Sequence, residues 1–243
     1  GKMTQMKELN LCSNGMGADG AAALAPALQV MTQMKELNLG SNGIRADGAR
    51  ALAPAMQEMT KMKVLNLCNN GMGDEGAIAL APALQVMTQM NVLDLSGSDT
   101  FGYYGIGAEG AIALAPALQE MTQMKVLNLG KNSIRAKGAR ALAPGLRKMT
   151  QLKSLNLYNS HIGDEGTRAI ASALRRMTKL EYLNLWKSSV TDEGVVALAP
   201  ALQVMTRLGY LNLAYNDIGR RGFRALGPVY DAIHRRGGCF RML

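Results

Sequence analysis

The sequence predicts a right-handed α/β solenoid, in which one strand-turn-helix unit is stacked repeatedly along an axis. A phrase of the type Leu-Asn-Leu returns eight times in the 243 residues, and all but one of the steps between copies are 28 residues long. Apolar residues at helical spacing follow each copy. A fixed period of this size indicates a solenoid, because each unit buries its apolar face only against its neighbours. The copies start at Met6, Met34, Met62, Met90, Met124, Leu152, Leu180 and Leu208.

The third copy illustrates the elements of one unit in order. Residues 64–67 alternate between exposed and apolar positions, as a half-buried strand does. A turn that contains Asn70 and two glycines follows. Residues 74–87 then carry apolar side chains at helical spacing, and they begin with two carboxylates, which the helix dipole favours at that end. Each unit is therefore predicted as strand, turn, helix and return.

The repeated pattern L-x-L-x-x-N-x-(Ile/Met)-x-x-x-G-x-x-x-L-x-x-x-L, over residues 6 to about 235, resembles the leucine-rich repeat. The 28-residue spacing with a full helix resembles the ribonuclease-inhibitor-like type of that family. This resemblance implies a horseshoe with a parallel β-sheet on its concave face and helices on its convex face. Elementary geometry agrees, because helices need more lateral room than strands and the stack must curve toward the strands.

Three columns of repeated residues are predicted to be structural. Methionines before each return fill the core, acid pairs at helix starts cap the helices, and asparagines resembling the ladder of the family bond the turn backbone. Serine replaces the asparagine at Ser160 and Ser188. The methionines are Met31, Met59, Met87, Met121, Met149, Met177 and Met205, the acid pairs are Asp74-Glu75, Asp164-Glu165 and Asp192-Glu193, and the asparagines are Asn14, Asn42, Asn70, Asn132 and Asn216.

The unbroken repeat predicts a single domain over residues 1–243. Residues 1–5 are expected to be the tail of a preceding repeat or a tag, because Lys2-Met3-Thr4-Gln5 matches a phrase that ends a later repeat, so we expect the chain to begin inside a longer protein. Residues 223–243 depart from the consensus and are predicted to form a C-terminal cap. The first repeat has no recognisable cap, which favours self-association through that end.

The three cysteines and the hydropathy pattern bear on the cellular setting. Cys12 and Cys68 occupy equivalent positions two strands apart, about 10 Å at the usual strand spacing, which is beyond the reach of a disulfide. Free thiols favour a reducing, cytoplasmic location. The sequence has no apolar run near the length that crosses a bilayer, so we expect no membrane insertion.

The residues that differ between copies are the candidates for function. The strand positions that face the concave surface change from small and mildly acidic in the first copies to aromatic in the last three. We expect these aromatic residues and their basic neighbours to bind a protein ligand, because aromatic side chains offer large contact area at low entropic cost. The predicted concave site consists of Tyr158, Tyr182, Trp186, Tyr210, Tyr215, Lys131, Lys187 and His161.

A second candidate is the only copy that is 34 residues long. Its six extra residues fall within residues 96–105, in the connection from strand to helix at one rim of the horseshoe. The insertion carries Phe101, Tyr103 and Tyr104, which we predict to contact a partner. The alternative is an ordinary loop insertion with single surface aromatics.

The charge is divided unevenly along the chain. Residues 1–121 have 7 Lys and Arg against 11 Asp and Glu, whereas residues 122–243 have 20 against 7. This excess of basic residues favours a solvated convex face or attraction to an acidic partner. We expect no nucleic-acid binding, because no dense basic-aromatic motif is present.

No catalytic or metal-ligating constellation can be assembled from the sequence. The chain has two histidines, His161 in a turn and His234 near the end, without metal-ligand spacing or a nucleophile-base pair. We therefore predict a non-enzymatic module without cofactor or metal.

The resemblance leaves several roles open. A ligand-sensing array of a NOD-like innate immune receptor, which uses 28-residue repeats after other domains, fits best. A GTPase-activating or scaffold protein of the Ran-GAP-like type is an alternative. An enzyme (nuclease) inhibitor is a further alternative, although ribonuclease inhibitors look acidic and cysteine-rich and this chain is basic with three cysteines.

Overall fold

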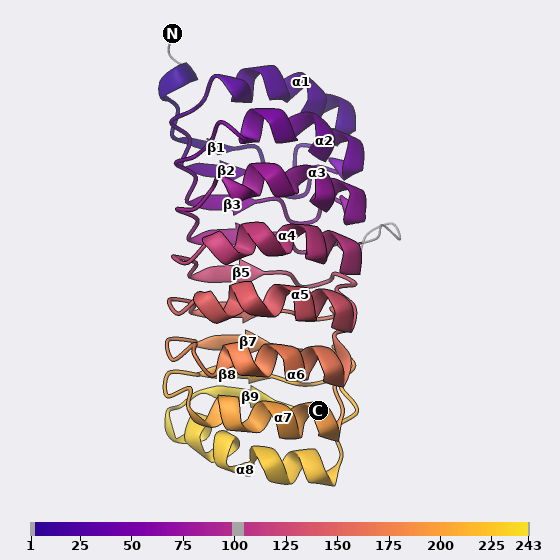
Figure 1. Cartoon of the computed structure of the whole chain (residues 1–243), viewed down its shortest axis with the longest axis vertical. Coiled ribbons are helices and arrows are strands. Elements are labelled where there is room, and N and C mark those ends of the chain that lie inside the picture. Colours follow the sequence, from indigo (N-terminus) through magenta and orange to yellow (C-terminus); the bar gives the residue numbers. More distant parts are fainter. Residues whose placement is uncertain (1–2, 99–104, 243) are drawn as a thin grey trace.

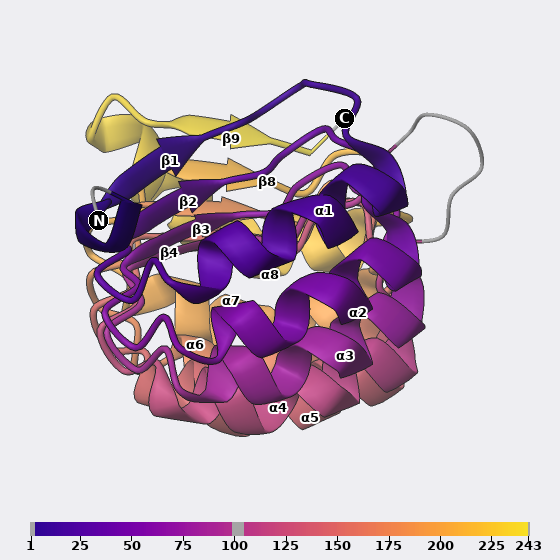
Figure 2. The ribbon, with the colours of Figure 1, turned by 90° about the horizontal axis from the view of Figure 1, so that it is seen from above.

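The predicted α/β solenoid is confirmed by a computed structural model, which describes residues 3–98 and 105–242. In this part of the chain, nine parallel strands form one sheet in chain order and alternate with eight α-helices. Figure 1 shows the units stacked along the longest axis of the molecule. Seen from above in Figure 2, the strands lie on the inner side of a curved array and the helices on its outer side. The sheet is therefore the concave face, as predicted.

The strands are short and the helices span three to four turns. The strands are β1 Glu8–Asn10, β2 Glu36–Asn38, β3 Val64–Asn66, β4 Val92–Asp94, β5 Val126–Asn128, β6 Ser154–Asn156, β7 Tyr182–Asn184, β8 Tyr210–Asn212 and β9 Cys239–Arg241. The helices are α1 Gly17–Gln29, α2 Arg45–Met56, α3 Gly73–Gln85, α4 Ala108–Glu120, α5 Arg135–Lys148, α6 Gly163–Leu174, α7 Asp192–Gln203 and α8 Arg220–Arg235.

Equivalent residues of neighbouring copies pair in register across the whole sheet, from Leu9 beside Leu37 to Leu211 beside Phe240. Residues on either side of each buried strand leucine point to the concave face, because side chains alternate along a strand. The column of methionines is buried, with each at most 1% exposed, which confirms its prediction as core filler. The sheet, the helices and these methionines enclose one continuous apolar core.

The asparagine ladder is confirmed at Asn42, which is buried between two copies. Its Nδ2 donates to the carbonyl oxygens of Leu11 and Leu39 at 2.8 and 3.0 Å, and its Oδ1 accepts from the backbone N–H of Asn14 at 2.9 Å. Where serine replaces asparagine, the Ser188 hydroxyl keeps the donor function, to a carbonyl oxygen of the preceding copy at 2.9 Å. Each ladder residue therefore links its own turn to the turn before it.

The prediction that the acid pairs cap their own helices is wrong. Each aspartate accepts hydrogen bonds from the start of the next helix along the chain, and each glutamate pairs with an arginine of a neighbouring helix. Asp192 at the start of α7 accepts from the backbone N–H groups of Gly219 and Gly222 in α8, at 2.7 and 2.8 Å. Asp74 and Asp164 cap α4 and α7 in the same way. The physical reason is the stacking of the units, which brings the next helix start within reach of the carboxylate. These bonds satisfy N–H groups that lack a partner within their own helix.

The two ends of the described chain differ in form. A short 3-10 helix, Met3–Gln5, precedes β1. The predicted cap, residues 223–243, contains most of α8 together with strand β9, which pairs with β8. The three cysteines are free, as predicted for Cys12 and Cys68. Among the described residues, no helix is both long and apolar enough to cross a bilayer.

Candidate functional site: a concave aromatic patch

Five aromatic side chains of the last three copies lie on or beside the concave face, and we call them the aromatic patch: Tyr158, Tyr182, Trp186, Tyr210 and Tyr215. Tyr182 and Tyr210 precede a buried strand leucine, and Tyr158 and Trp186 follow one, so all four point away from the core. Tyr215 follows in the turn after β8 and is 71% exposed. The patch therefore rests on three neighbouring units of one rigid sheet.

The first group of the patch is centred on Trp186. Its ring lies 6.2 Å from that of Tyr158 and 5.0 Å from that of Tyr215, at interplanar angles of 53° and 58°. Lys131 Nζ lies 5.7 Å from the Tyr158 ring centroid, and Lys187 Nζ lies 5.8 Å from the Trp186 ring. Such positions allow cation–π attraction. The structure thus brings together five of the predicted site residues.

A glycine in the neighbouring unit makes room for this group. A Cβ atom placed on Gly130 would overlap the ring of Tyr158, so this ring covers the glycine. The position is equivalent to Tyr158 itself one repeat earlier. Gly130 is therefore part of the site, although its sequence position alone gives no sign of this role.

The second group is a stacked pair. The rings of Tyr182 and Tyr210 lie 4.4 Å apart and 5° from parallel. Their hydroxyls accept hydrogen bonds from Nδ2 of Asn184 and Asn212, at 3.2 and 3.3 Å. Burial raises the pKa of Tyr182, the hydrogen bond from Asn184 opposes this, and the nearby Tyr210 raises it further. The Tyr182 hydroxyl consequently stays protonated at neutral pH.

Arg241 and Asn159 also lie at this surface, but they were not predicted from the sequence. Arg241 pairs in register with Asn212, which places it on the concave face beside Tyr210. Aligning residues 240–242 with the Leu-Asn-Leu phrase at 211–213 would have found it. Asn159 has a buried Oδ1 with no hydrogen-bond partner among the described residues. It sits directly after Tyr158, and no pattern in the sequence distinguishes it.

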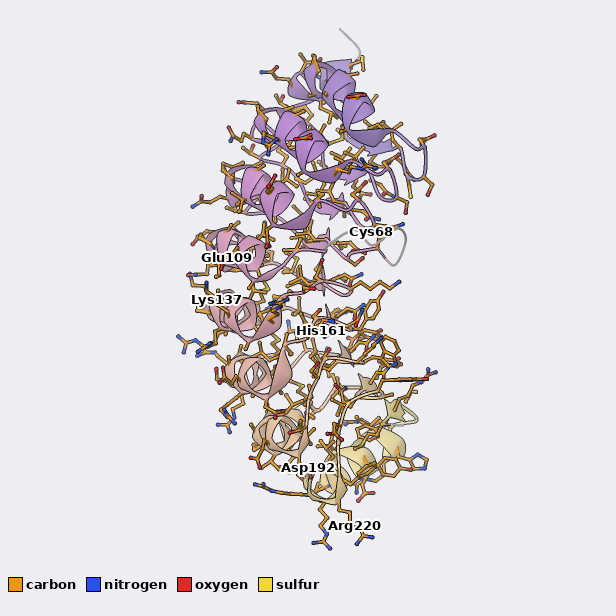
Figure 3. All side chains as sticks on the ribbon, turned by 90° about the vertical axis from the view of Figure 1, so that its right-hand side faces the viewer. Cys68, Glu109, Lys137, His161, Asp192 and Arg220 are labelled. Carbon is orange, nitrogen blue, oxygen red and sulfur yellow. The ribbon has the colours of Figure 1, made fainter. Side chains whose placement is uncertain are left out.

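The remaining predicted residues lie elsewhere. His161 is exposed in the turn after β6, with a left-handed φ of 52°, and belongs to neither aromatic group; Figure 3 labels it. Phe101, Tyr103 and Tyr104 lie outside the described residues. The described residues that flank them adjoin the patch, because a Cβ atom on Gly105 would be 2.5 Å from the carbonyl oxygen of Lys131. The base of the insertion is thus next to a lysine of the first group.

The convex face carries charge pairs between neighbouring helices. Lys137 Nζ lies 2.6 Å from Glu109 Oε1, and both side chains are more than half exposed. Figure 3 labels this pair on the helix side of the molecule and Cys68 on the strand side. Further pairs of this kind link Arg50 to Glu75 and Arg140 to Glu165. Part of the basic excess is therefore solvated on the convex face, where exposed pairs contribute little stability.

Within the described ranges, no three His, Cys, Asp or Glu side chains are grouped so that they could hold a metal ion. The chemistry that the patch offers is therefore contact area, positive charge and hydrogen-bond donors.

Comparison with known protein families identifies the repeat. Seven segments match the family model described as Leucine Rich repeat, at residues 2–25, 30–53, 58–81, 121–143, 148–171, 176–199 and 206–227, which together make up more than half of the chain. No curated protein matches the sequence. Among solved structures, an internalin of Listeria monocytogenes is 16% identical, with a TM-score of 0.31 over 94% of this chain and 86% of that one. A leucine-rich repeat protein of Leptospira interrogans is 13% identical, with a TM-score of 0.28 over 93% and 83%.

Proposed function

Because this chain belongs to the leucine-rich repeat family, we propose that it is a non-enzymatic protein-recognition module that binds its partner through the aromatic patch. The observation that carries this proposal is the gathering of five aromatic side chains on one part of the concave face, in two mutually supporting groups. None of them is needed for the repeating core, which consists of aliphatic residues and methionine.

The physical properties of the patch support recognition. Tyrosine and tryptophan supply large contact area and lose few rotamers on binding. Here the rings are held in place by one another and by a sheet whose strands pair in register, so little ordering cost remains for a partner to overcome. Clusters of such residues commonly dominate the binding energy of an interface.

The test is an affinity pull-down from lysate of the cells that produce the protein, followed by measured binding of the captured partner. A triple variant, Trp186→Ala with Tyr158→Ala and Tyr182→Ala, is expected to lose the partner. Ile78→Ala is the control, because Ile78 is 49% exposed on α3, in a copy that does not contribute to the patch. Equal binding by the wild type and the triple variant would contradict the proposal. The single change Trp186→Ala should change the free energy of unfolding by only about 0.5 kcal/mol. A loss of binding by that variant would therefore not be caused by unfolding.

The predicted insertion residues are a second part of the same proposal. Gly97 and Gly105 hold the two ends of the insertion against the backbone of Lys131, next to the patch. A triple alanine variant of Phe101, Tyr103 and Tyr104 is expected to weaken the same partner. Unchanged affinity would limit the partner surface to the patch.

The narrower roles rest on the resemblance in repeat length and helix content. We propose the ribonuclease-inhibitor-like subtype, with its helices of 12 to 16 residues, and the ligand-sensing array of a NOD-like receptor acting in the cytoplasm. A GTPase-activating or scaffold role of the Ran-GAP-like type and an inhibitor role are the alternatives. Faster GTP hydrolysis by a small GTPase would favour the first alternative over the receptor role.

Self-association through the N-terminal end is a separate proposal. Strand β1 lies at the edge of the sheet, and Met6, Leu9 and Leu11 are only partly buried there. Exposed strand edges favour pairing with another chain. Light scattering across a wide concentration range tests this, and a monodisperse monomer would contradict it.

A further inference from the structure

The ring faces of the aromatic patch are largely used within the patch. Tyr182 and Tyr210 are stacked face to face, so nothing can enter between them. Trp186 has tilted rings on two sides and the Lys187 ammonium near its ring. Sugars and nucleic-acid bases bind aromatic side chains mainly through open ring faces. Because one face of each stacked ring and part of the Trp186 ring are already occupied, the partner also meets ring edges, which carry the positive part of the aromatic quadrupole.

Basic side chains add to this positive edge. Lys131 lies over Tyr158 at one end of the patch and Lys187 over Trp186 in the middle copy. Arg241 lies at the other end, on the strand next to β8 and in register with Asn212. Of the acidic residues close in sequence, Glu181 is paired with Lys153 at 3.5 Å, and Asp217 is exposed in the turn that follows Tyr215. The surroundings of the patch therefore favour an anionic partner.

The hydrogen-bonding groups of the patch also favour an anionic ligand, because most of their acceptor atoms are already used. The Oδ1 atoms of Asn184 and Asn212 already accept from the backbone N–H groups of Trp186 and Ala214, both at 3.0 Å. The Nδ2 groups of the same asparagines donate to the two tyrosine hydroxyls. Each hydroxyl is thus an acceptor from its asparagine. The two hydroxyls also share a side-chain hydrogen bond, which leaves one of their O–H protons to donate outward. A ligand rich in hydrogen-bond donors, such as a sugar, finds few free acceptors here, whereas a carboxylate finds donors and positive charge.

On the basis of the proposed function, we propose that the aromatic patch binds an acidic segment of polypeptide. Its carboxylates contact Lys187 within the patch and Arg241 at the β9 end, and its apolar side chains pack against the ring edges between them. Carboxylate contacts with lysine and arginine are charge-assisted and stronger than neutral hydrogen bonds.

The position of Trp186 gives a direct measurement, because it is the only tryptophan in the chain. The probe is a random copolymer of glutamate and tyrosine, titrated while tryptophan fluorescence is recorded. We expect a saturable change that weakens as salt is added, since salt screens exposed charges. The double variant Lys187→Gln, Arg241→Gln should bind the copolymer about tenfold more weakly, in line with the loss of two charge contacts. Lys137→Gln, which removes an ammonium from the convex face, should bind as the wild type does.

Three comparison probes define the outcomes that overturn the inference. A lysine-tyrosine copolymer has the opposite charge, oligothymidylate supplies bases and phosphates, and a neutral glucan supplies sugar rings. Failure of the glutamate-tyrosine copolymer to bind, or tighter binding of any of the three, would overturn the acidic-polypeptide assignment. The proposed function would survive that result if the triple alanine variant still lost its partner in the pull-down. Conversely, if the partner binds the triple variant normally, both the proposed function and the acidic-polypeptide assignment are wrong.

Discussion

The two halves of the concave face share one backbone and present different chemistry. In the first half, Glu8 pairs in register with Glu36, and the column after the second strand leucine contains Cys12, Gly40 and Cys68. In the second half, the same two columns carry the stacked tyrosines and the group around Trp186. The strand register is the same in both halves. The repeat thus sets the direction of each side chain, and the residues that vary between copies set what the surface can bind.

The Cys68 thiol in the first half stays protonated, and a protonated thiol is not nucleophilic. Burial is the main cause of the raised pKa of Cys68, and the charges of Asp94 and Cys12 add to it, against a hydrogen bond with Asn66 that lowers it. The Cys68 thiol therefore stays neutral at physiological pH. The first half consequently offers carboxylates and neutral small groups, and the second half offers rings and positive charge.

The largest expected effects test whether the scaffold is equivalent in both halves. Leu67 and Leu185 occupy the same strand position and are at most 1% exposed. Replacing either by alanine leaves a cavity in the continuous core, and we expect each change to lower the free energy of unfolding by about 2–5 kcal/mol. Denaturant unfolding measures both. A cost confined to one half would show that the scaffolds are not equivalent.

Aspartates at helix starts should differ according to whether they accept from the next helix or only face solvent. Asp192→Ala removes the acceptor for two backbone N–H groups of α8, and we expect a loss of about 1 kcal/mol. Asp47 occupies the first turn of α2, where it pairs with Arg50 at 2.6 Å on an exposed surface. Asp47→Ala should cost less than about 0.5 kcal/mol. Equal costs would contradict the assignment of Asp192 as the cap of the next helix.

Two equivalent glycines sharpen the comparison at the concave surface. A Cβ atom on Gly130 would overlap the Tyr158 ring, whereas one on Gly40 would lie 3.0 Å from the sulfur of Cys68. We expect Gly130→Ala to displace the ring, destabilise the protein by about 1 kcal/mol and change the Trp186 emission. Gly40→Ala should leave the emission unchanged and have the smaller effect on stability. An unchanged emission in Gly130→Ala would show that Tyr158 does not support Trp186.

The fold could be predicted because the same strand-turn-helix pattern occurs in every copy of the repeat. The strand leucines, the methionine column and the asparagine ladder recur at a fixed spacing, and each copy confirms the role of the others. The candidate site was predicted only in part. The columns place Tyr158, Tyr182, Trp186 and Tyr210 on one face, but the groups into which they gather depend on side-chain rotamers and on neighbouring units.

The errors in the predicted site and caps have separate physical reasons. Arg241 belongs to a strand whose Cys239-Phe240-Arg241 phrase departs from the consensus, so its register is visible only once β9 pairs with β8. The direction of the aspartate caps depends on the distance between neighbouring helices, which a single copy does not contain. His161 was assigned to the site from its place in the chain alone, and its exposed ring makes no contact with either aromatic group.

The smallest expected effect concerns the ionisation of the second half. Burial raises the pKa of Tyr182 above the ordinary value of about 10, and Tyr210 adds to this. The folded state therefore holds this proton more tightly than the unfolded state does. The resulting stabilisation is present below about pH 10 and is lost as the pH rises through the folded-state pKa.

We expect ultraviolet absorbance at rising pH to show a late-ionising tyrosine that disappears in Tyr182→Phe and persists in Tyr215→Phe. Because the second half alone has this stacked pair among the described residues, alkaline pH should loosen the patch while the carboxylates of the first half keep their charge. Simultaneous ionisation of all tyrosines would mean that Tyr182 is not held between Asn184 and Tyr210, and the stacked pair would then lose its place in the site.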